Sequence, residues 1–455
     1  MIDSKQDRIF AKAAGMARAA FVFARMYHFL GKSQWWSKER LREYQLKQLK
    51  TLLEHAYQNV PYYRKTWEDA NFQPDDLKTL NDIKRLPFTI KQIFQENHDA
   101  LRATNLSPEK LSYVTTGGST GIPFGFFEER YAAAAREAAF IHSLWRRVGY
   151  RVGDKRIVLR GELIEGADKG RFYHYNPARR ELSLSAYHMN DENLPGYIKI
   201  IKDFGAKYIH AYPSSITILA DYMKKNHLPP LQFIRAILVG SENLYDWQRQ
   251  LLEDAFQCKI YSWYGHAEKA VLAGECEESH HYHIFPEYGI TELIDENGNE
   301  VTQEGQVGEI VATGFCNYAM PFIRYRTMDL GVCAANPCAC GRNYPILRKI
   351  EGRLQELIVT DDNRLISMTA INMHNSLFDN VRQFQFYQER RGEVVLNIVK
   401  SASYGEHDDY RIKEEIGAKL GNNMRLHLNF VDEIPRTKSG KFRFLIQKLP
   451  VVHGD

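Results

Sequence analysis

Apolar residues recur at helical spacing in a polar stretch near the start of the chain. The stretch runs over residues 37–57, and its apolar positions are Leu41, Leu49, Leu52, Leu53 and Ala56. This spacing predicts a helix with one buried face. Ser37 is a suitable cap for the first turn, because a serine side chain can accept a hydrogen bond from a free backbone N–H.

A different pattern fills the middle of the chain, where short apolar runs alternate with helix-like segments. Strands are expected at 206–212, 233–239 and 259–263, with helices at 214–225 and 245–256. Such an alternation predicts a parallel sheet flanked by helices. Ligands of these sheets bind beyond the carboxyl ends of the strands. We therefore expect the loops after the three strands to meet at one edge.

Those three loops are polar or contain glycine. They are Tyr212-Pro213-Ser214, Gly240-Ser241-Glu242 and Tyr264-Gly265-His266-Ala267-Glu268. A carboxylate such as Glu268 suits a Mg²⁺ ligand beside a bound nucleotide, since Mg²⁺ takes one or two carboxylates together with phosphates. The plain alternative is an exposed glutamate without a role.

The pattern changes again toward the end of the chain. Short strands with turns are expected over 283–313, hairpins over 357–367 and 384–399, a helix over 410–420 and a strand over 425–431. We therefore predict an α/β fold in two parts. Residues 1–352 form a large N-terminal domain with helix-flanked parallel or mixed sheets and a short β-rich region, and residues 353–455 form a small α+β domain.

Composition and charge exclude several classes of protein. Of the 455 residues, 44% are hydrophobic and 25% charged, which is the balance of a globular chain. The 60 basic and 56 acidic side chains nearly cancel, so nothing indicates a nucleic-acid partner. We expect a cytoplasmic protein.

The first thirty residues are the place to look for a targeting or membrane segment. The apolar stretch over 16–30 is interrupted by Arg18, Arg25 and His28, so it is unsuited to cross a bilayer. Lys12 and Arg18 also break any signal-peptide core. We expect a helix that covers the edge of a domain. The alternative is a basic amphipathic helix that makes peripheral contact with a membrane surface.

The stretch TTGGSTGIP, residues 115–123, combines glycines with hydroxyl side chains. Glycines let backbone N–H groups turn toward an anion, and hydroxyls add donors to phosphate oxygens. The stretch is not a Walker loop, because no Gly-Lys-Ser/Thr follows. Its alternative interpretation is a solvated surface turn.

Two further motifs carry candidate chemistry. In RYRTMDLG, which begins at Arg324, Asp329 could accept hydrogen bonds from ribose hydroxyls, or it could simply cap a turn. In PRTKSGK, which begins at Pro435, Lys441 supplies a mobile positive charge suited to a transferring phosphoryl group. A solvated basic tail is the alternative for that segment.

The order and spacing of these motifs are more informative than any one of them. TTGGSTGIP, YGHAE, RYRTMDLG, GRLQELI from Gly352 and PRTKSGK follow the order of the core motifs of the adenylate-forming superfamily, which the chain resembles over essentially its whole length. Within it, the chain is similar to the phenylacetate–CoA ligase family, in its CapK-like capsule-biosynthesis branch. The stretches that carry this likeness are SQWWSKERL from Ser33, HAYQNVPYYRK from His55, HAYPSS from His210 and CACGRNYPI from Cys338.

The resemblance implies roles for particular residues. ATP phosphates would be held by Thr116, Gly117, Gly118, Ser119, Thr120 and Gly121, and the adenine by Gly240, Ser241, Glu242, Tyr264 and Gly265. Asp329 would bind the ribose with help from Arg353. Glu268 would be the catalytic Mg²⁺ ligand, and Lys441 would bridge the carboxylate and the α-phosphate. Gln355 would be the hinge of a mobile C-terminal domain.

The sequence departs from the usual family pattern at four positions. They are Ile122 in place of lysine, Ala267 in place of threonine, Met328 in place of glycine, and Gln355 in place of aspartate or lysine. Ile122 removes one phosphate contact. Lys441, Asp329 and Glu268 are retained, so we expect an active enzyme.

The resemblance also implies a reaction. A carboxylic acid and ATP would give an acyl-adenylate and pyrophosphate, and the acyl group would pass to a thiol, most simply coenzyme A. The acid itself is unspecified, and its pocket would draw on His142, Trp145, Tyr208, His210 and Tyr212. The CapK-like branch suggests a role in capsule or cell-envelope polysaccharide synthesis, and a homodimer is an additional expectation. The rivals are an adenylyltransferase that stops at the acyl-AMP, and a catalytically silent binding protein on the same fold.

Four of the cysteine and histidine residues form a candidate zinc site. Cys276, His283, Cys338 and Cys340 are a mixed ligand set of the kind that binds structural Zn²⁺ tetrahedrally. His280, His281 and Cys333 are alternative ligands. The competing interpretation is that the cysteines are free and buried.

Overall fold

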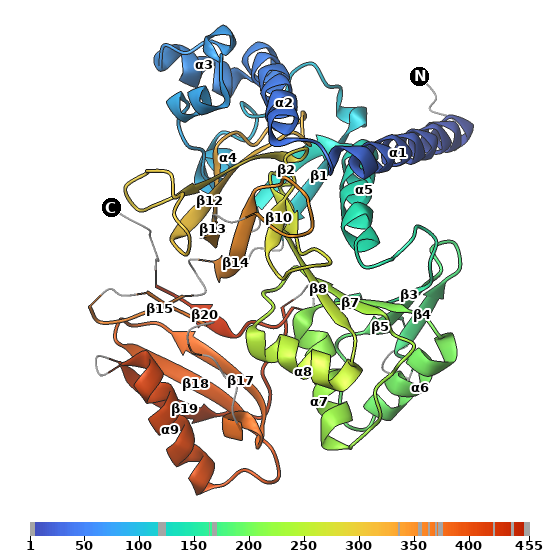
Figure 1. The fold of residues 1–455 in the computed structure, drawn as a ribbon, viewed down its shortest axis with the longest axis vertical. Helices are drawn as coiled ribbons and strands as arrows, with labels where there is room; N and C mark the ends of the chain where they lie inside the picture. Colours follow the sequence, from blue (N-terminus) through green and yellow to red (C-terminus); the bar gives the residue numbers. More distant parts are fainter. Residues whose placement is uncertain are drawn as a thin grey trace. The chain divides into compact units, whose positions relative to one another are not determined.

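The computed structural model describes residues 5–116, 124–162, 164–165, 171–334, 337–353, 357–362, 365–368, 371, 376–421, 424–437 and 441–449. The chain divides into two compact units, which are described separately (Figure 1). Unit 1 consists of Met1–Val152, Trp263–Thr327 and Gly331–Lys349, and unit 2 of Gly153–Ser262, Met328–Leu330 and Ile350–Asp455.

Unit 1 begins with helical segments. They are α1 (Lys5–Ser33), α2 (Lys38–Asn59), α3 (Pro61–Asp69), α4 (Lys91–Glu96) and α5 (Ala132–Arg146), with single 3₁₀ turns at Pro74–Asp76, Leu80–Arg85 and Pro108–Lys110. Helix α2 confirms the first prediction, since its buried residues are the five apolar positions named from the sequence. Ser37 caps it and accepts a hydrogen bond from the Arg40 N–H at 3.3 Å.

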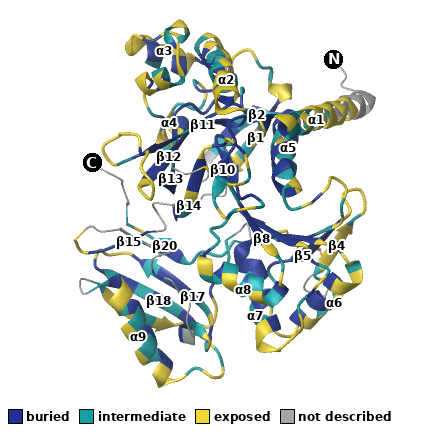
Figure 2. Cartoon of the chain, in the orientation of Figure 1, coloured by how far each residue is buried: buried dark blue, intermediate teal, exposed yellow. Residues whose placement is uncertain are grey.

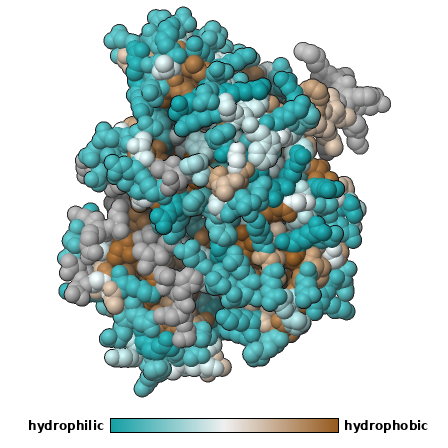
Figure 3. Space-filling view, in the orientation of Figure 1, coloured by the Kyte–Doolittle hydropathy of each residue, from teal (hydrophilic) through white to brown (hydrophobic). Residues whose placement is uncertain are grey.

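Helix α1 is longer than expected and packs against α5 through aromatic side chains. The ring of Phe23 meets that of His142 edge-on at 5.4 Å. Met16 and Phe21 on α1 stay 60% and 66% exposed. Figure 3 shows a mostly hydrophilic surface with weakly hydrophobic side chains along the exposed part of α1. Within the described part of the chain, no helix is both long enough and apolar enough to cross a bilayer.

The strands of unit 1 form a hairpin and part of a larger sheet. The hairpin pairs β1 (Leu111–Thr116) with β2 (Phe124–Glu129). The sheet has the order β11-β12-β13-β14-β10-β9-β8. Its strands are β8 (Lys259–Gly265), β9 (Leu272–Gly274), β10 (Tyr282–Ile284), β11 (Gly289–Ile294), β12 (Val307–Gly314), β13 (Tyr325–Ala334) and β14 (Ile346–Arg353). Strands β10, β11 and β12 confirm the short strands expected over 283–313.

Unit 2 contains the predicted alternation of strands and helices. Its strands are β3 (Arg156–Arg160), β4 (Tyr173–Asn176), β5 (Glu181–Ser185), β6 (Tyr208–Ala211) and β7 (Ala236–Gly240), in the order β7-β6-β3-β5-β4. The pairs β7–β6, β6–β3 and β3–β5 are parallel, and the edge strand β4 is antiparallel. The division between the units falls within β8.

Three helices cover one face of this parallel sheet: α6 (Leu194–Phe204), α7 (Pro213–Lys225) and α8 (Asp246–Phe256) (Figure 1). The strand residues in that core include Ile157, Leu159, Leu182, Leu184, Ile209, Ile237 and Val239. They alternate along each strand, so they share one face of the sheet. Burial of such side chains stabilises the layer by about 1.5–3 kcal/mol each.

The C-terminal part of unit 2 is an α+β structure. The hairpin of β15 (Leu357–Val359) and β16 (Leu365–Ser367) is followed by a 3₁₀ turn, Ser376–Phe378, and a sheet of order β19-β18-β17-β20. The elements of that sheet layer are β17 (Val381–Gln388), β18 (Glu393–Lys400), α9 (Glu406–Leu420), β19 (Arg425–Phe430) and β20 (Leu445–Gln447). Figure 2 shows α9 with a buried side and an exposed side. The predicted hairpins, helix and strand are present, and β20 is additional.

The α/β fold class is therefore confirmed. The residues from Ile350 onward fall in the same compact unit as the parallel sheet. The predicted boundary at residue 352 separates a large domain from a mobile C-terminal domain. This boundary stays a prediction.

Candidate active site and metal cluster

The carboxyl ends of β3, β6 and β7 bring polar side chains together in unit 2. Arg160 is the last residue of β3, and its Nη2 donates a hydrogen bond to Ser241 Oγ at 2.6 Å, just after β7. The guanidinium carbon lies 4.7 Å from the ring centroid of Tyr212, which follows β6. Ser241 adopts a φ of 69°, so the chain turns sharply there. Two of the three predicted strand-end loops thus meet at one edge.

Glu242 ties those loops to the C-terminal part of unit 2. Its carboxylate accepts hydrogen bonds from the Ser214 N–H at 3.0 Å, the Ser214 hydroxyl at 3.1 Å and the Phe442 N–H at 3.1 Å. Burial raises the pKa of Glu242, and the hydrogen bonds act in the opposite direction. A buried carboxylate with three donors fixes segments that lie far apart in the sequence.

The described residues of the PRTKSGK motif are held against this edge. The Arg436 guanidinium donates to the hydroxyls of Ser214 and Ser215 at 3.3 and 3.4 Å. The Lys441 N–H donates a hydrogen bond to Thr437 Oγ1 at 3.0 Å. Lys441 Nζ then lies 6.0 Å from the ring centroid of Tyr212. The predicted catalytic lysine therefore stands next to a predicted pocket residue.

Asp329, the predicted ribose ligand, lies in β13 and is buried. Arg353, its predicted helper, ends β14, and its side chain is outside the described residues. The hinge residue Gln355 is outside them as well.

Glu268, the predicted Mg²⁺ ligand, is held by two aromatic neighbours within unit 1. Its carboxylate accepts a hydrogen bond from the Tyr325 hydroxyl at 3.3 Å, and its other oxygen lies 3.1 Å from His266 Nδ1. The side chain is only 13% exposed. Tyr264 and Gly265, predicted to line the adenine site, end strand β8. A fixed carboxylate with hard oxygen donors fits the needs of Mg²⁺.

The predicted phosphate loop begins at the end of β1. Thr116 is the last residue of that strand. Gly117, Gly118, Ser119, Thr120 and Gly121 lie outside the described residues.

The predicted pocket residues divide between the two units. In unit 1, His142 and Trp145 on α5 pack with Tyr150, with ring centroids 5.3–5.5 Å apart. In unit 2, Tyr208 and His210 belong to β6, and both are buried. Their role in binding the acid stays a prediction.

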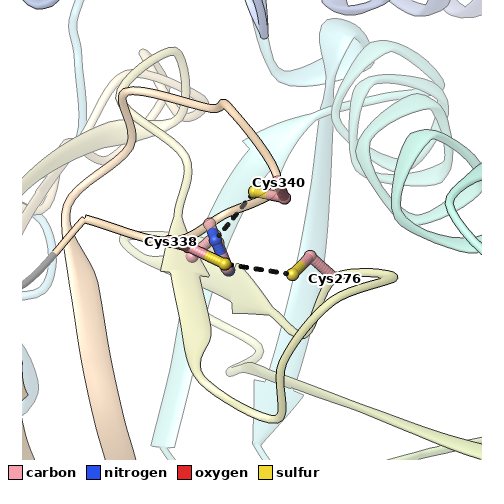
Figure 4. A group of neighbouring side chains, drawn as sticks. Cys276, Cys338 and Cys340 are labelled. Atoms are coloured by element: carbon pink, nitrogen blue, oxygen red, sulfur yellow. Dashed lines mark hydrogen bonds between the residues drawn. The ribbon is translucent and has the colours of Figure 1, made fainter.

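The predicted zinc ligands gather into one cluster in unit 1. Cys276 follows β9, His283 lies in β10, and Cys338 and Cys340 lie in the loop between β13 and β14. Their ligand atoms all lie within 4.8 Å of one another. Figure 4 shows the three cysteine sulfurs pointing toward a common centre.

The spacing of the ligand atoms fits tetrahedral zinc. Zn–S bonds of about 2.3 Å and Zn–N bonds of about 2.0–2.1 Å place two sulfurs about 3.8 Å apart, and a sulfur and a nitrogen about 3.5 Å apart. Cys276 Sγ lies 3.6 Å from Cys338 Sγ, and Cys340 Sγ lies 3.3 Å from His283 Nε2. The protein therefore places these atoms near their positions in a zinc complex.

Hydrogen bonds to neighbouring backbone groups orient two of these four side chains. His283 Nδ1 lies 3.1 Å from the carbonyl oxygen of His281, so a proton on Nδ1 leaves the lone pair of Nε2 for a metal. Backbone N–H groups of Glu278 and Ser279 point to Cys276 Sγ at 3.3 Å each. Burial alone would raise the pKa of Cys276, but these donors and His283 outweigh it and lower the pKa to about 5.

The alternative zinc ligands are not part of this cluster. Among the described residues it comprises Cys276, His283, Cys338 and Cys340 alone, without His280, His281 or Cys333. The His280 side chain is 60% exposed, beside Glu275.

Comparison with known proteins identifies the family. The chain is 30% identical over 331 residues to the phenylacetate–coenzyme A ligase of Pseudomonas putida, covering 71% of this chain and 73% of that enzyme. This chain belongs to the phenylacetate–CoA ligase family. Like that family, it is an acid–thiol ligase of the adenylate-forming class. It is also 26% identical to protein CapK of Staphylococcus aureus over 415 residues, 90% of each chain.

Two further matches bear on this phenylacetate–CoA ligase homologue. The model of the CapK C-terminal domain family matches residues 357–448. A 2-hydroxyisobutyryl-CoA ligase, solved in its postadenylation state with 2-HIB-AMP, superimposes with a TM-score of 0.72 at 21% identity and covers 92% of this chain and 93% of that one. The match supports the adenylate-forming fold over both units.

Two arginines that lie at the strand ends, Arg160 and Arg436, were not predicted from the sequence. Arg160 ends a run of three apolar residues and precedes Gly161, which is a usable signal for a strand end. Arg436 lies inside the PRTKSGK motif, but its contacts with Ser214 and Ser215 depend on tertiary structure alone.

Proposed function

We propose that this protein uses ATP and Mg²⁺ to convert a carboxylic acid into its acyl-adenylate, and then transfers the acyl group to coenzyme A. The observation that carries the proposal is the attachment of the PRTKSGK loop to the strand ends, through Glu242 and the Phe442 N–H at 3.1 Å. That attachment supports a role for Lys441 at the reacting carboxylate, because it holds the lysine next to Tyr212.

In the first step, a carboxylate oxygen attacks the α-phosphorus of ATP and pyrophosphate leaves. Both reactants are anionic, so the barrier falls when positive charge is placed where they meet. Lys441 would supply that charge between the carboxylate and the α-phosphate. Glu268 would hold Mg²⁺, which neutralises phosphate charge when bound. Asp329 would hold the ribose hydroxyls.

In the second step, the coenzyme A thiolate attacks the acyl carbon and AMP leaves. Lys441 is needed for the first attack only, and we infer that residues 353–455 rotate about Gln355 between the steps, as hinged domains do. From the CapK-like resemblance we further propose a role in supplying acyl groups for surface polysaccharide.

The metal cluster would take a structural Zn²⁺. Cys276, His283, Cys338 and Cys340 would supply four protein ligands, which would complete a tetrahedral shell and leave no open position for a reactant. The ion would join the segment after β9 to the loop between β13 and β14.

ATP–pyrophosphate exchange over a panel of carboxylic acids tests the first step. We expect exchange that depends on one class of acid, and thioester formation only when coenzyme A is added. Acid-dependent exchange without any thioester would favour an enzyme that stops at the acyl-AMP. Absence of exchange with every acid would contradict the proposal.

A further inference from the structure

The half-buried Arg160 contacts a hydroxyl, an imidazole and a phenol ring. Its Nη2 donates to Ser241 Oγ at 2.6 Å, its Nη1 lies 3.3 Å from His210 Nε2, and its face covers Tyr212. The buried Nε has no hydrogen-bond partner. Among the described residues, no carboxylate forms an ion pair with it.

Two other arginines of low exposure are paired with carboxylates. Arg156, four positions earlier on the same strand, donates twice to Glu181 at 2.9 and 2.5 Å. Arg324 is fully enclosed and forms two bonds with Glu292 at 3.1 and 2.8 Å. A ligand that supplies negative charge would stabilise a guanidinium that forms no ion pair within the protein.

The position of Arg160 suggests which ligand supplies the charge. Arg160 and Lys441 lie against the same Tyr212 ring, at 4.7 and 6.0 Å from its centroid. In the proposed reaction, Lys441 meets the carboxylate that is activated. Arg160 stands at the same aromatic ring as a second, separate cation, with His210 beside it.

We propose that Arg160 binds a second anionic group of the acid, so that the substrate class is carboxylic acids that carry another negative charge, such as dicarboxylic acids. This inference rests on the proposed function and specifies its substrate. A guanidinium presents a planar fork of donors that matches a carboxylate. The unpartnered Nε adds a donor to that fork.

The test uses ATP–pyrophosphate exchange with pairs of acids matched in shape. Suitable pairs are glutarate with valerate, and 4-carboxyphenylacetate with 4-methylphenylacetate. We expect the wild type to prefer the doubly charged member of a pair by about 10- to 150-fold in kcat/KM, the range that one charged hydrogen bond provides. Arg160→Met should abolish this preference, with the larger loss of kcat/KM on the doubly charged member. Arg160→Lys should retain part of it.

The possible outcomes separate this inference from the proposed function. A wild type that prefers the singly charged members, or shows no preference, overturns the inference alone, and does so without any variant. An equal loss on both members in Arg160→Met indicates a structural role and overturns the inference. Absence of exchange with every acid contradicts the proposed function, and the inference with it.

Discussion

Removal of the cysteine pair Cys338 and Cys340 is the sharpest test of the metal cluster. We expect the purified protein to contain one zinc ion per chain, and the double variant Cys338→Ser, Cys340→Ser to contain none. Serine keeps the size of the side chain but removes the thiolate that binds zinc. The variant should also melt at a lower temperature, because a metal that binds only the folded state stabilises it.

The expected size of the change follows from mass action. A site whose free zinc is about a thousand times its Kd stabilises the folded state by about 4 kcal/mol. In a body of about 150–250 residues, each kcal/mol moves Tm by about 2–4 °C. Loss of zinc should therefore lower the Tm of unit 1 by about 8–16 °C. The ligand atoms already lie within 4.8 Å of one another, so rearrangement on binding should cost little of the binding free energy.

The assay is elemental analysis of protein purified without added zinc, followed by calorimetry. The matched control is Cys258→Ser, which changes a thiol outside the cluster and should keep the zinc. Zinc should also be released as the pH falls, since protons compete for the thiolates and for His283. A native protein free of zinc, with the same Tm after zinc is added, would refute the reasoning. So would a double variant that retains one ion per chain.

Three further predictions concern single residues. Lys441→Ala should abolish acyl-AMP formation in pyrophosphate exchange but spare thioester formation from supplied acyl-AMP; a near wild-type exchange rate would show that the role of Lys441 is wrong. Arg324→Met should lower the free energy of unfolding by about 3–5 kcal/mol in urea titration, because it leaves Glu292 charged and buried. Burial raises the pKa of Glu137, whose carboxylate accepts the Tyr288 hydroxyl, so its contribution to stability is present below the unfolded pKa and is lost as pH rises through the folded one. The stability of Glu137→Gln relative to the wild type should therefore increase between pH 5 and pH 8. A difference in urea midpoint between the two proteins that is the same at pH 5 and pH 8 would contradict this.

Local patterns were sufficient to predict the elements that have long or regular periodicity. Helix α2 and its five buried residues follow from spacing alone. Strand β6 is shorter than predicted, at Tyr208–Ala211. Strand β20 has three residues and pairs in parallel with β17, so its signal is non-local and no periodicity could reveal it.

The candidate site was predictable in its residue types but not in its contacts. The candidate zinc ligands are recognisable because cysteine and histidine have few other reasons to gather, although Cys276 and Cys338 are 62 positions apart. Arg160 carries no such signal. An arginine at a strand end has no special meaning in a sequence. Only the tertiary structure shows which side chains surround it.

The contacts of Glu242 show why a motif near the end of the chain can serve a site near its middle. Its bond to the Phe442 N–H spans 200 positions. Such a long loop costs little more to close than one of half its length, since the entropy of closure grows only with the logarithm of length. A buried carboxylate left without donors would cost far more. The bond therefore favours the arrangement in which Lys441 lies near Tyr212. A rotation that withdraws Lys441 must break this bond and supply Glu242 with other donors, so Glu242 is where the proposed movement would meet its main local resistance.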